Sequence, residues 1–380
     1  MKNLPLLLIV LLFMLACQTK KDPSNTQTNP SGNSVYLMVG SYSNGKTSGI
    51  SVYDFDLQDA GFKLVSEIKN ILNPSYLVVS PNKKLVYSVN ETGKGSVTSF
   101  RFDKSTGTLD SINSQDTGGA DPCYINIDNK QSMILTANYT GGNISVFPLS
   151  DSGKVLPVSQ LIDFNAINDR RASHIHTVVF SPDQTSVFAT DLGKDQITRF
   201  RVDLNDINKQ FLKIDGTPIT LERGSGPRHI DFHPLKNFAY CLNELSGKVT
   251  VFQYSAKGGL TPIQYIASDT TTAGEKKGSA DIHVSPDGRF LYASNRLNND
   301  GIAIFSIDLN TGRLTPAGYQ KTGIHPRNFI ISSNGKYLLC ANRDSNTIQI
   351  FAINQQTGLL SDTGKEIQLN KPVCLKWVPK

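Results

Sequence analysis

The sequence predicts an all-β protein, a seven-bladed β-propeller built of four-stranded antiparallel blades. Three observations indicate this fold. One unit recurs along the chain at steps of 46 to 53 residues, each copy contains four short β-like segments, and the two chain ends supply complementary parts of one copy. Periods of this size are typical of propeller blades, and no stretch shows helical periodicity of useful length.

The copies align on the residue that opens an apolar strand. These anchor residues are Pro74, Pro122, Ile175, Pro227, Ser279, Pro326 and Pro372. After each anchor comes a strand, an SPDG-like turn and a second strand, as in DIHVSPDGRFLYASN. Alternating segments such as GKVTVF predict the third strand, and a G-x-L segment leads into the fourth.

The chain ends predict how the ring closes. The first copy, VYLMVGSYSNGKTSGISVYDFD, lacks an opening strand, whereas the last, PVCLKWVP, is only an opening strand. Pairing the C-terminal strand into the first blade completes it and removes two exposed edges. We therefore expect residues 34–380 to form one closed propeller.

The N-terminus predicts export and a lipid anchor. An apolar run from Leu4 to Ala16 is shorter than the roughly 20 residues that cross a bilayer. It ends in L-A-C, which is typical of a bacterial lipoprotein signal. We expect residues 1–16 to be a signal peptide, Cys17 to be lipidated, and residues 17–33 to be a flexible polar tether. The protein would then lie on the periplasmic or cell-surface side of a bacterial membrane.

Composition limits the partners. A formal net charge of +6 without a basic stripe argues against a nucleic-acid partner, and we expect a monomer. The four remaining cysteines show no C-x-x-C spacing, so we expect neither a zinc site nor a redox motif. The apolar stretches FAYCLN and YLLCAN favour buried free thiols at Cys241 and Cys340, although the redox state of Cys123, Cys241, Cys340 and Cys374 stays open.

Two positions of each copy are predicted to point toward one mouth of the central tunnel, because the first two strands form a hairpin that is open there. Directly after the anchors come Ser75, Cys123, His176, Arg228, Ala280, Arg327 and Val373. At the other end of the hairpin come Tyr42, Glu91, Tyr139, Leu192, Glu244, Arg296 and Arg343. The second series follows a recurring Asn or Asp, to which we assign a structural role in the turn.

The ionisable residues of these two series form a candidate site. His176, Arg228, Glu244 and Arg296 fall on consecutive blades four, five and six, so they lie on one side of the mouth. Glu91, Tyr139, Arg327 and Arg343 converge on the same mouth and are candidates for substrate binding. By strand alternation, His229 is expected to face away from the mouth and to pack against an adjoining blade.

The segments of residues 174–200, 224–252 and 279–305 resemble the bacterial lactonase family of seven-bladed propellers. This family includes propeller-type 6-phosphogluconolactonases and resembles the carboxy-cis,cis-muconate lactonizing enzymes. GPRH…NEL and SNR are the most specific parts of a resemblance that covers about residues 34–379.

The resemblance implies an active site formed by His176, Arg228, Glu244 and Arg296, acting on a lactone without a metal or other cofactor. We expect His176, with a pKa near neutrality, to be the general base, and the two arginines to hold the substrate and stabilise the oxyanion. Glu244 would orient them or serve as the base itself. Arg343 stands where many relatives carry glutamine, and it would attract an anionic substrate or pair with Glu91.

Three other functions remain open from the sequence. One is a calcium-dependent lactonase, which the arginines around the mouth oppose. The second is a muconate-type cycloisomerase of the same fold, and the third is a lipid-tethered binding propeller without enzymatic activity. Export also leaves open whether the lactone is phosphorylated, because a phosphogluconolactonase of sugar metabolism is expected in the cytoplasm.

Overall fold

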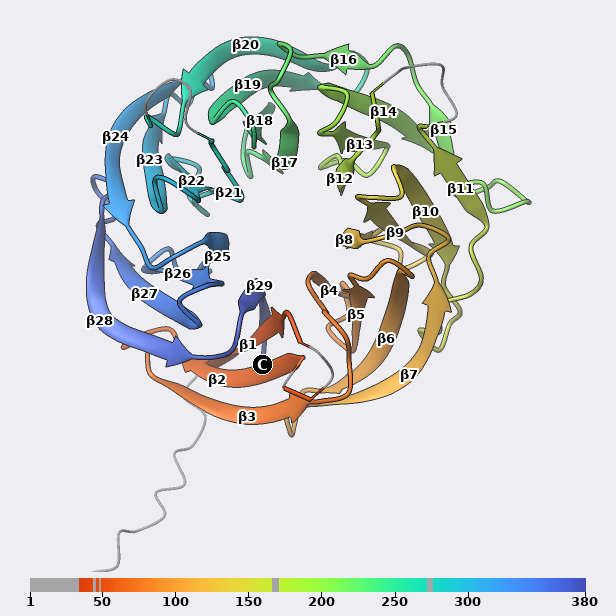
Figure 1. The fold of residues 1–380 in the computed structure, drawn as a ribbon, viewed down its shortest axis with the longest axis horizontal. Helices are drawn as coiled ribbons and strands as arrows, with labels where there is room; N and C mark the ends of the chain where they lie inside the picture. The colour runs from red at the N-terminus through yellow and green to blue at the C-terminus, as the bar shows by residue number, and fades with distance from the viewer. Residues whose placement is uncertain (1–33, 44–45, 48, 166–170, 272–275) are drawn as a thin grey trace, which may run out of the picture. The chain divides into compact units, whose positions relative to one another are not determined.

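The computed structural model describes residues 34–380, apart from 44–45, 48, 166–170 and 272–275. Every regular element in these residues is a β-strand, and the strands form seven sheets around a common axis (Figure 1). The predicted seven-bladed propeller is therefore confirmed. We call the axial region enclosed by the seven innermost strands the tunnel, and the end at which those strands begin the mouth.

Each blade is an antiparallel sheet whose strands run in order from the axis outward. Blade 1 comprises β29 (Pro372–Pro379), β1 (Ser34–Ser41), β2 (Ile50–Asp56) and β3 (Phe62–Ile68). Blade 2 comprises β4 (Leu77–Val79), β5 (Leu85–Asn90), β6 (Ser96–Asp103) and β7 (Thr108–Asp116). Blade 3 comprises β8 (Pro122–Ile127), β9 (Met133–Asn138), β10 (Asn143–Pro148) and β11 (Gln160–Asp163).

The later blades repeat this order. Blade 4 comprises β12 (Ile175–Phe180), β13 (Ser186–Asp191), β14 (Gln196–Val202) and β15 (Leu212–Ile214), with β16 (Ile219–Thr220) also paired to β14. Blade 5 comprises β17 (Pro227–Phe232), β18 (Phe238–Asn243), β19 (Lys248–Ser255) and β20 (Gly259–Ala267). Blade 6 comprises β21 (Ile282–Val284), β22 (Phe290–Asn295), β23 (Gly301–Ile307) and β24 (Leu314–Lys321). Blade 7 comprises β25 (Pro326–Ile331), β26 (Tyr337–Asn342), β27 (Thr347–Ile353) and β28 (Leu360–Gln368).

Burial falls from the inner to the outer strands. All six residues of β9, β13, β18 and β22 are buried, whereas β3 is mostly exposed. A second strand is covered on both faces by neighbouring blades, so it is continuously apolar or small rather than alternating. The core therefore lies between the blades.

A repeated tyrosine fastens neighbouring blades. The hydroxyl of Tyr240 on β18 donates to the carbonyl of Gly312 in the next blade, at 3.1 Å. Tyr292 on β22 makes the equivalent hydrogen bond to Gly358 at 2.8 Å. Both tyrosine side chains are fully buried, so each hydroxyl satisfies a polar group that would otherwise be left unpaired between blades.

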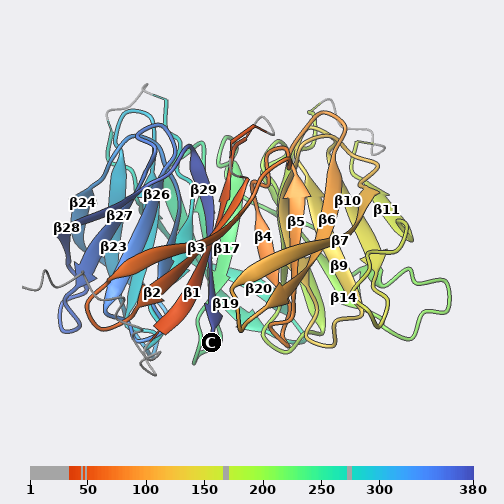
Figure 2. The ribbon, with the colours of Figure 1, turned by 90° about the horizontal axis from the view of Figure 1, so that it is seen from below.

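Closure of the ring is as predicted. Strand β29 pairs antiparallel with β1, placing Leu37 opposite Trp377, and the two strands lie side by side in both ribbon views (Figures 1 and 2). The indole of Trp377 also packs 5.1 Å from the ring of Phe55 and donates to the carbonyl of Ile331 at 2.9 Å. The C-terminal strand thus connects blade 1 to blade 7.

The His229 side chain does not face away from the mouth as expected, because several innermost strands, including β17, begin with β-bulges. The register between β17 and β18 skips one residue, so Pro227 lies opposite Asn243 while His229 lies opposite Leu242. The same shift occurs at the start of β8, β12 and β25. A bulge places two residues opposite one, which breaks strict alternation, so Arg228 and His229 both reach into the tunnel. His229 does contact adjoining blades, as expected: its ring packs against that of His176 in blade 4, with centroids 5.2 Å apart, and its Nδ1 makes a hydrogen bond to Asp281.

The recurring Asn and Asp residues make structural hydrogen bonds in their hairpins. Asn243, for example, donates to Thr250 at 2.9 Å, and Asp191 accepts from the backbone of Lys194 at 3.1 Å. The partners are mostly side chains of the third strand, such as Ser145 for Asn138 and Gln349 for Asn342, rather than the turn backbone that Asp191 binds. All four cysteines of the propeller are buried and free, as expected for Cys241 and Cys340.

The expected signal peptide (1–16), the lipidated Cys17 and the tether (17–33) lie outside the described residues. Within the described part of the chain, no helix has the length and apolar character required to cross a membrane.

Candidate active site at the tunnel mouth

Glu244 joins two of the predicted arginines. It follows β18, and its Oε2 lies 2.9 Å from Nε of Arg228, while its Oε1 lies 3.1 Å from Nη2 of Arg296 in blade 6. The arginine side chains are 2% and 6% exposed, and that of Glu244 is 22% exposed. Burial would raise the pKa of Glu244, but Arg296 and Arg228 outweigh that effect and hold it below its usual value. Glu244 is therefore an anion fixed between two cations.

Backbone carbonyls orient the same two arginines. Nη1 of Arg228 donates to the carbonyl of Ala280, and Nε of Arg296 donates to the carbonyl of Gly278 at 2.7 Å. Both carbonyls belong to the segment that enters blade 6. Two buried guanidinium groups are thus held at fixed positions next to one carboxylate, an arrangement suited to binding the oxygen atoms of a substrate.

His176, the predicted general base, lies beside this group. It is 4% exposed, and its ring centroid lies 5.6 Å from that of Tyr139 and 5.2 Å from that of His229. Burial and the nearby Arg228 lower its pKa well below the usual value of a histidine. The expectation of a near-neutral pKa was therefore wrong. His176 is an uncharged imidazole at neutral pH.

Cys123 lies next to His176 but lacks the properties of a nucleophile. Its Sγ is 3.8 Å from Nδ1 of His176. Burial and the charge of Glu91 raise the pKa of the thiol, so it stays protonated.

Glu91, Arg327 and Tyr42 form a second polar group at the mouth. The hydroxyl of Tyr42 donates to Oε1 of Glu91 at 2.8 Å, and Nη2 of Arg327 lies 3.8 Å from Oε2. The guanidinium of Arg327 also lies over the Tyr42 ring, 5.4 Å from its centroid. Arg327 influences the pKa values of both His176 and Glu244, so this group shares the electrostatic environment of the first.

Two further predicted residues lie at the margins of the site. Tyr139 stacks on the ring of His174, with centroids 4.6 Å apart. Arg343 makes two contacts to its neighbour Asp344, at 2.7 and 2.8 Å, so Asp344 and not Glu91 is its partner. Within the described residues, no group of three or more His, Cys, Asp or Glu side chains is arranged to hold a metal ion.

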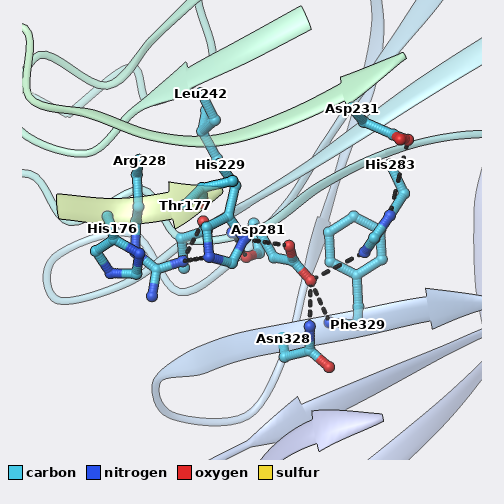
Figure 3. A network of polar contacts seen from close by, with 12 residues as sticks. His176, Thr177, Arg228, His229, Asp231, Leu242, Asp281, His283, Asn328 and Phe329 are labelled. Carbon is cyan, nitrogen blue, oxygen red and sulfur yellow. Dashed lines mark hydrogen bonds and ion pairs between the residues drawn. The ribbon is translucent and has the colours of Figure 1, made fainter. Parts of the chain in front are cut away.

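The sequence missed several residues of this site. Asp281, next to Ala280, accepts a hydrogen bond from His229 at 2.7 Å, and Figure 3 shows it at the centre of a buried network. His325 precedes the anchor Pro326 and contacts Arg296 at 3.2 Å. The alternation rule hid His229, because it ignores the bulge at the start of β17, and it assigned the mouth position of blade 6 to Ala280 rather than to the adjacent Asp281. The only available signal for His325 was its place in the segment HPR beside a predicted site arginine.

Comparisons with known proteins identify a family and relatives that cover nearly the whole propeller. Residues 36–377 match the family described as "Lactonase, 7-bladed beta-propeller". A 6-phosphogluconolactonase of Formosa agariphila is 39% identical over 347 residues, covering 88% of this chain and 97% of the relative.

Two solved structures are also similar. A putative 6-phosphogluconolactonase from Bacteroides fragilis is 46% identical with a TM-score of 0.85, covering 94% of this chain and all of the other. A periplasmic gluconolactonase of Pseudomonas aeruginosa is 32% identical with a TM-score of 0.85, covering 91% of this chain and 99% of the other.

Proposed function

The chain belongs to the lactonase family of seven-bladed β-propellers, and from that premise we propose that it hydrolyses a sugar lactone at the tunnel mouth without a metal ion. The observation that supports this site best is the pair of buried arginines, Arg228 and Arg296, held on the single carboxylate of Glu244. The relatives named 6-phosphogluconolactonase and gluconolactonase support the lactone substrate.

In this proposal the arginines act on the carbonyl oxygen and the substrate hydroxyls. A water oxygen attacks the lactone carbonyl carbon, and the electrons of the C=O bond move to oxygen. Arg228 and Arg296 stabilise the oxyanion that forms, because they are fixed before the reaction begins. Collapse of the tetrahedral intermediate breaks the ring C–O bond and releases a hydroxy acid.

His176 is proposed to move the proton. It is the uncharged basic side chain of the four, since Glu244 is engaged by both arginines. The imidazole takes a proton from the attacking water, and the imidazolium returns it to the leaving ring oxygen. A strongly lowered pKa weakens the first transfer but makes the imidazolium a good acid for the second.

The charge distribution favours an unphosphorylated lactone. Arg228 and Arg296 share Glu244, Arg327 faces Glu91, and Arg343 pairs with Asp344. Four mouth arginines thus face three carboxylates, which leaves little net positive charge for a phosphate dianion. A periplasmic gluconolactonase among the similar structures is consistent with this choice.

The direct test is hydrolysis of glucono-δ-lactone and 6-phosphogluconolactone by residues 34–380, with and without EDTA and with spontaneous hydrolysis subtracted. We expect turnover that survives EDTA, with the higher kcat/KM for glucono-δ-lactone. Arg228→Lys keeps the charge but loses the planar fork, so kcat/KM should fall by roughly 100-fold. Arg289→Lys, at an exposed turn, is the matched control.

Other outcomes would redirect the assignment. Loss of turnover in EDTA would point to the calcium-dependent alternative. Absence of turnover together with conversion of a muconate would indicate a cycloisomerase. No reaction with any of these substrates would favour a binding propeller.

We also propose export and anchoring through Cys17, on the basis of the L-A-C sequence that ends the apolar run. In a bacterial host, the full chain should fractionate with membranes and Cys17→Ser should not. Recovery of both forms in the cytoplasm would contradict this.

A further inference from the structure

Each of the two arginines that share Glu244 also contacts a histidine. Nη1 of Arg228 lies 3.2 Å from Nε2 of His229, and Nη1 of Arg296 lies 3.2 Å from Nε2 of His325. The two contacts have the same atoms and the same length, although His229 follows its arginine in sequence and His325 comes from another blade.

These contacts determine the protonation of both histidines. A guanidinium group can only donate, so Nε2 of each imidazole must accept and must carry no proton. The single proton of the neutral ring is then on Nδ1. Burial and the neighbouring arginines lower the pKa of His229 to about 4 and that of His325 to about 3, consistent with neutral rings.

The opposite side of each ring faces an aspartate. Nδ1 of His229 lies 2.7 Å from Oδ1 of Asp281, and Nδ1 of His325 lies 3.4 Å from Oδ2 of Asp344. A carboxylate accepts a hydrogen bond from an Nδ1–H group and therefore favours the tautomer that the arginine requires.

The chain of contacts from Arg228 through His229 to Asp281 is fixed by a buried network (Figure 3). Asp281 is 1% exposed, and its Oδ2 also contacts Nε2 of His283 at 3.1 Å and accepts from the Asn328 side chain and the Phe329 backbone. His283 has a pKa raised to about 10, since Asp281 and then Asp231 outweigh its burial, so Asp281 keeps its negative charge beside a cation.

In the second chain of contacts, from Arg296 through His325 to Asp344, the backbone of His325 is held in place. His325 has a φ of 62°, in the left-handed region that few residues other than glycine adopt, and its backbone N–H donates to Asp300 at 2.9 Å. Asn73, Asp121 and Lys371, which also precede anchor prolines, share this conformation, so it belongs to the turn of the blade and it fixes the backbone from which the His325 side chain extends.

We propose that His229 with Asp281, and His325 with Asp344, are positioning pairs that hold the guanidinium groups of Arg228 and Arg296 through a neutral, accepting Nε2. This rests on the lactonase function proposed above. An arginine has many rotamers, and each extra acceptor on the side away from the substrate restricts them before the substrate binds. An imidazolium in the same place would point its Nε2–H donor at an N–H donor of the guanidinium, and the two groups would repel each other.

The test compares two isosteres at each histidine. Glutamine places its amide oxygen near the Nε2 position, so His229→Gln and His325→Gln should keep kcat/KM for glucono-δ-lactone within about 5-fold. Asparagine reaches only the Nδ1 position, so His229→Asn and His325→Asn should lower kcat by ~10 to 100-fold, as displacement of a reacting group does.

A matched control comes from His233, another buried histidine. Its Nδ1 accepts from the backbone of Leu235 at 3.1 Å and its Nε2 lies 3.0 Å from the carbonyl of Gly288, just beyond the end of β17 that is opposite to the mouth. His233→Gln and His233→Asn should therefore have equal kinetics. Equal kinetics of the Gln and Asn variants at 229 and 325 as well would overturn the positioning role.

The second measurement is made on the wild-type protein and requires no enzymatic turnover. The histidine variants serve there only to assign the NMR signals. In the wild-type propeller at pH 7, ¹⁵N NMR of labelled histidine should show the Nδ1–H tautomer for His229 and His325. His233 should show the opposite Nε2–H tautomer, which makes it an internal reference. An Nε2–H tautomer or an imidazolium at 229 or 325 would overturn the proposed geometry.

Asp344→Ala tests the pair of His325 and Asp344. It leaves no cavity in the core, since the Asp344 side chain is 36% exposed. It should shift His325 partly to the Nε2–H tautomer and lower kcat several-fold at an unchanged Tm. An unchanged tautomer and unchanged kcat would overturn the role of Asp344. If the wild type hydrolysed no lactone, the proposed function would fail. If both histidines had the expected tautomers but the Gln and Asn variants had equal kinetics, only the positioning role would fail.

Discussion

Oε2 of Glu244 lies 2.9 Å from Nε of Arg228, whose side chain is 2% exposed. The pair lies in blade 5, while the second partner of the carboxylate, Arg296, belongs to blade 6. One carboxylate therefore binds two guanidinium groups that come from neighbouring blades, and it links the stability of the mouth to its proposed chemistry.

Glu244→Gln should lower both stability and activity. The neutral amide leaves two buried arginines close together without an anion, and breaking a buried ion pair from one side costs roughly 3 kcal/mol. We expect the free energy of unfolding in urea to fall by about that amount and kcat/KM by about 100-fold. Glu222→Gln, which removes an exposed pair with Lys248, should change neither by a measurable amount.

The rate should not fall near the ordinary pKa of histidine. Burial and then Arg228 lower the pKa of His176, so its basic form persists as the pH falls through 6.5. The groups that set this pKa or lie against the ring are Arg228, His229, Arg296, Arg327, Cys123 and Tyr139. We expect kcat/KM for glucono-δ-lactone to be flat between pH 7.5 and 5.5, and an acid limb centred near 6.5 would contradict the assigned pKa direction.

The tyrosines between blades should contribute to stability alone. Tyr240→Phe leaves the buried carbonyl of Gly312 without its partner, which costs roughly 1 to 2 kcal/mol. Thermal unfolding should shift to lower temperature while kcat/KM stays at the wild-type value. Tyr265→Phe, at a side chain that is 44% exposed, is the control and should leave Tm unchanged.

Closure by the last strand should be essential for folding. Ending the chain at Lys371 removes β29 and exposes the edge of β1 together with the inner faces of blades 1 and 7. We expect loss of the cooperative thermal transition seen by circular dichroism. Removing only Lys380, which forms a pair with Asp54 at 2.7 Å, should preserve that transition.

Much of the fold was predictable from local patterns. The anchor spacing, the SPDG-like turns and the incomplete first and last copies each specify a blade or its closure, since turn residues and alternation act over a few residues. The same register placed Arg228, Glu244 and Arg296 at one mouth, where the ion pairs now lie.

The protonation states of the site were not predictable in this way. His176 was expected near neutrality, but its pKa depends on burial and on arginines from blades that are distant in sequence. The partner of Arg343 was likewise undecided until the fold placed Asp344 against it and gave Glu91 to Tyr42 and Arg327.

The sequence by itself determined the number of blades, the way the ring closes and the place of Arg228, Glu244 and Arg296 at the mouth, because these follow from short-range periodicity repeated seven times. Only the tertiary structure decided that His229 enters the tunnel, that Asp281 and His325 join the site, and which charges pair. The physical reason is that a β-bulge shifts the side-chain direction by one residue, and that burial and charge around a side chain are set by neighbouring blades.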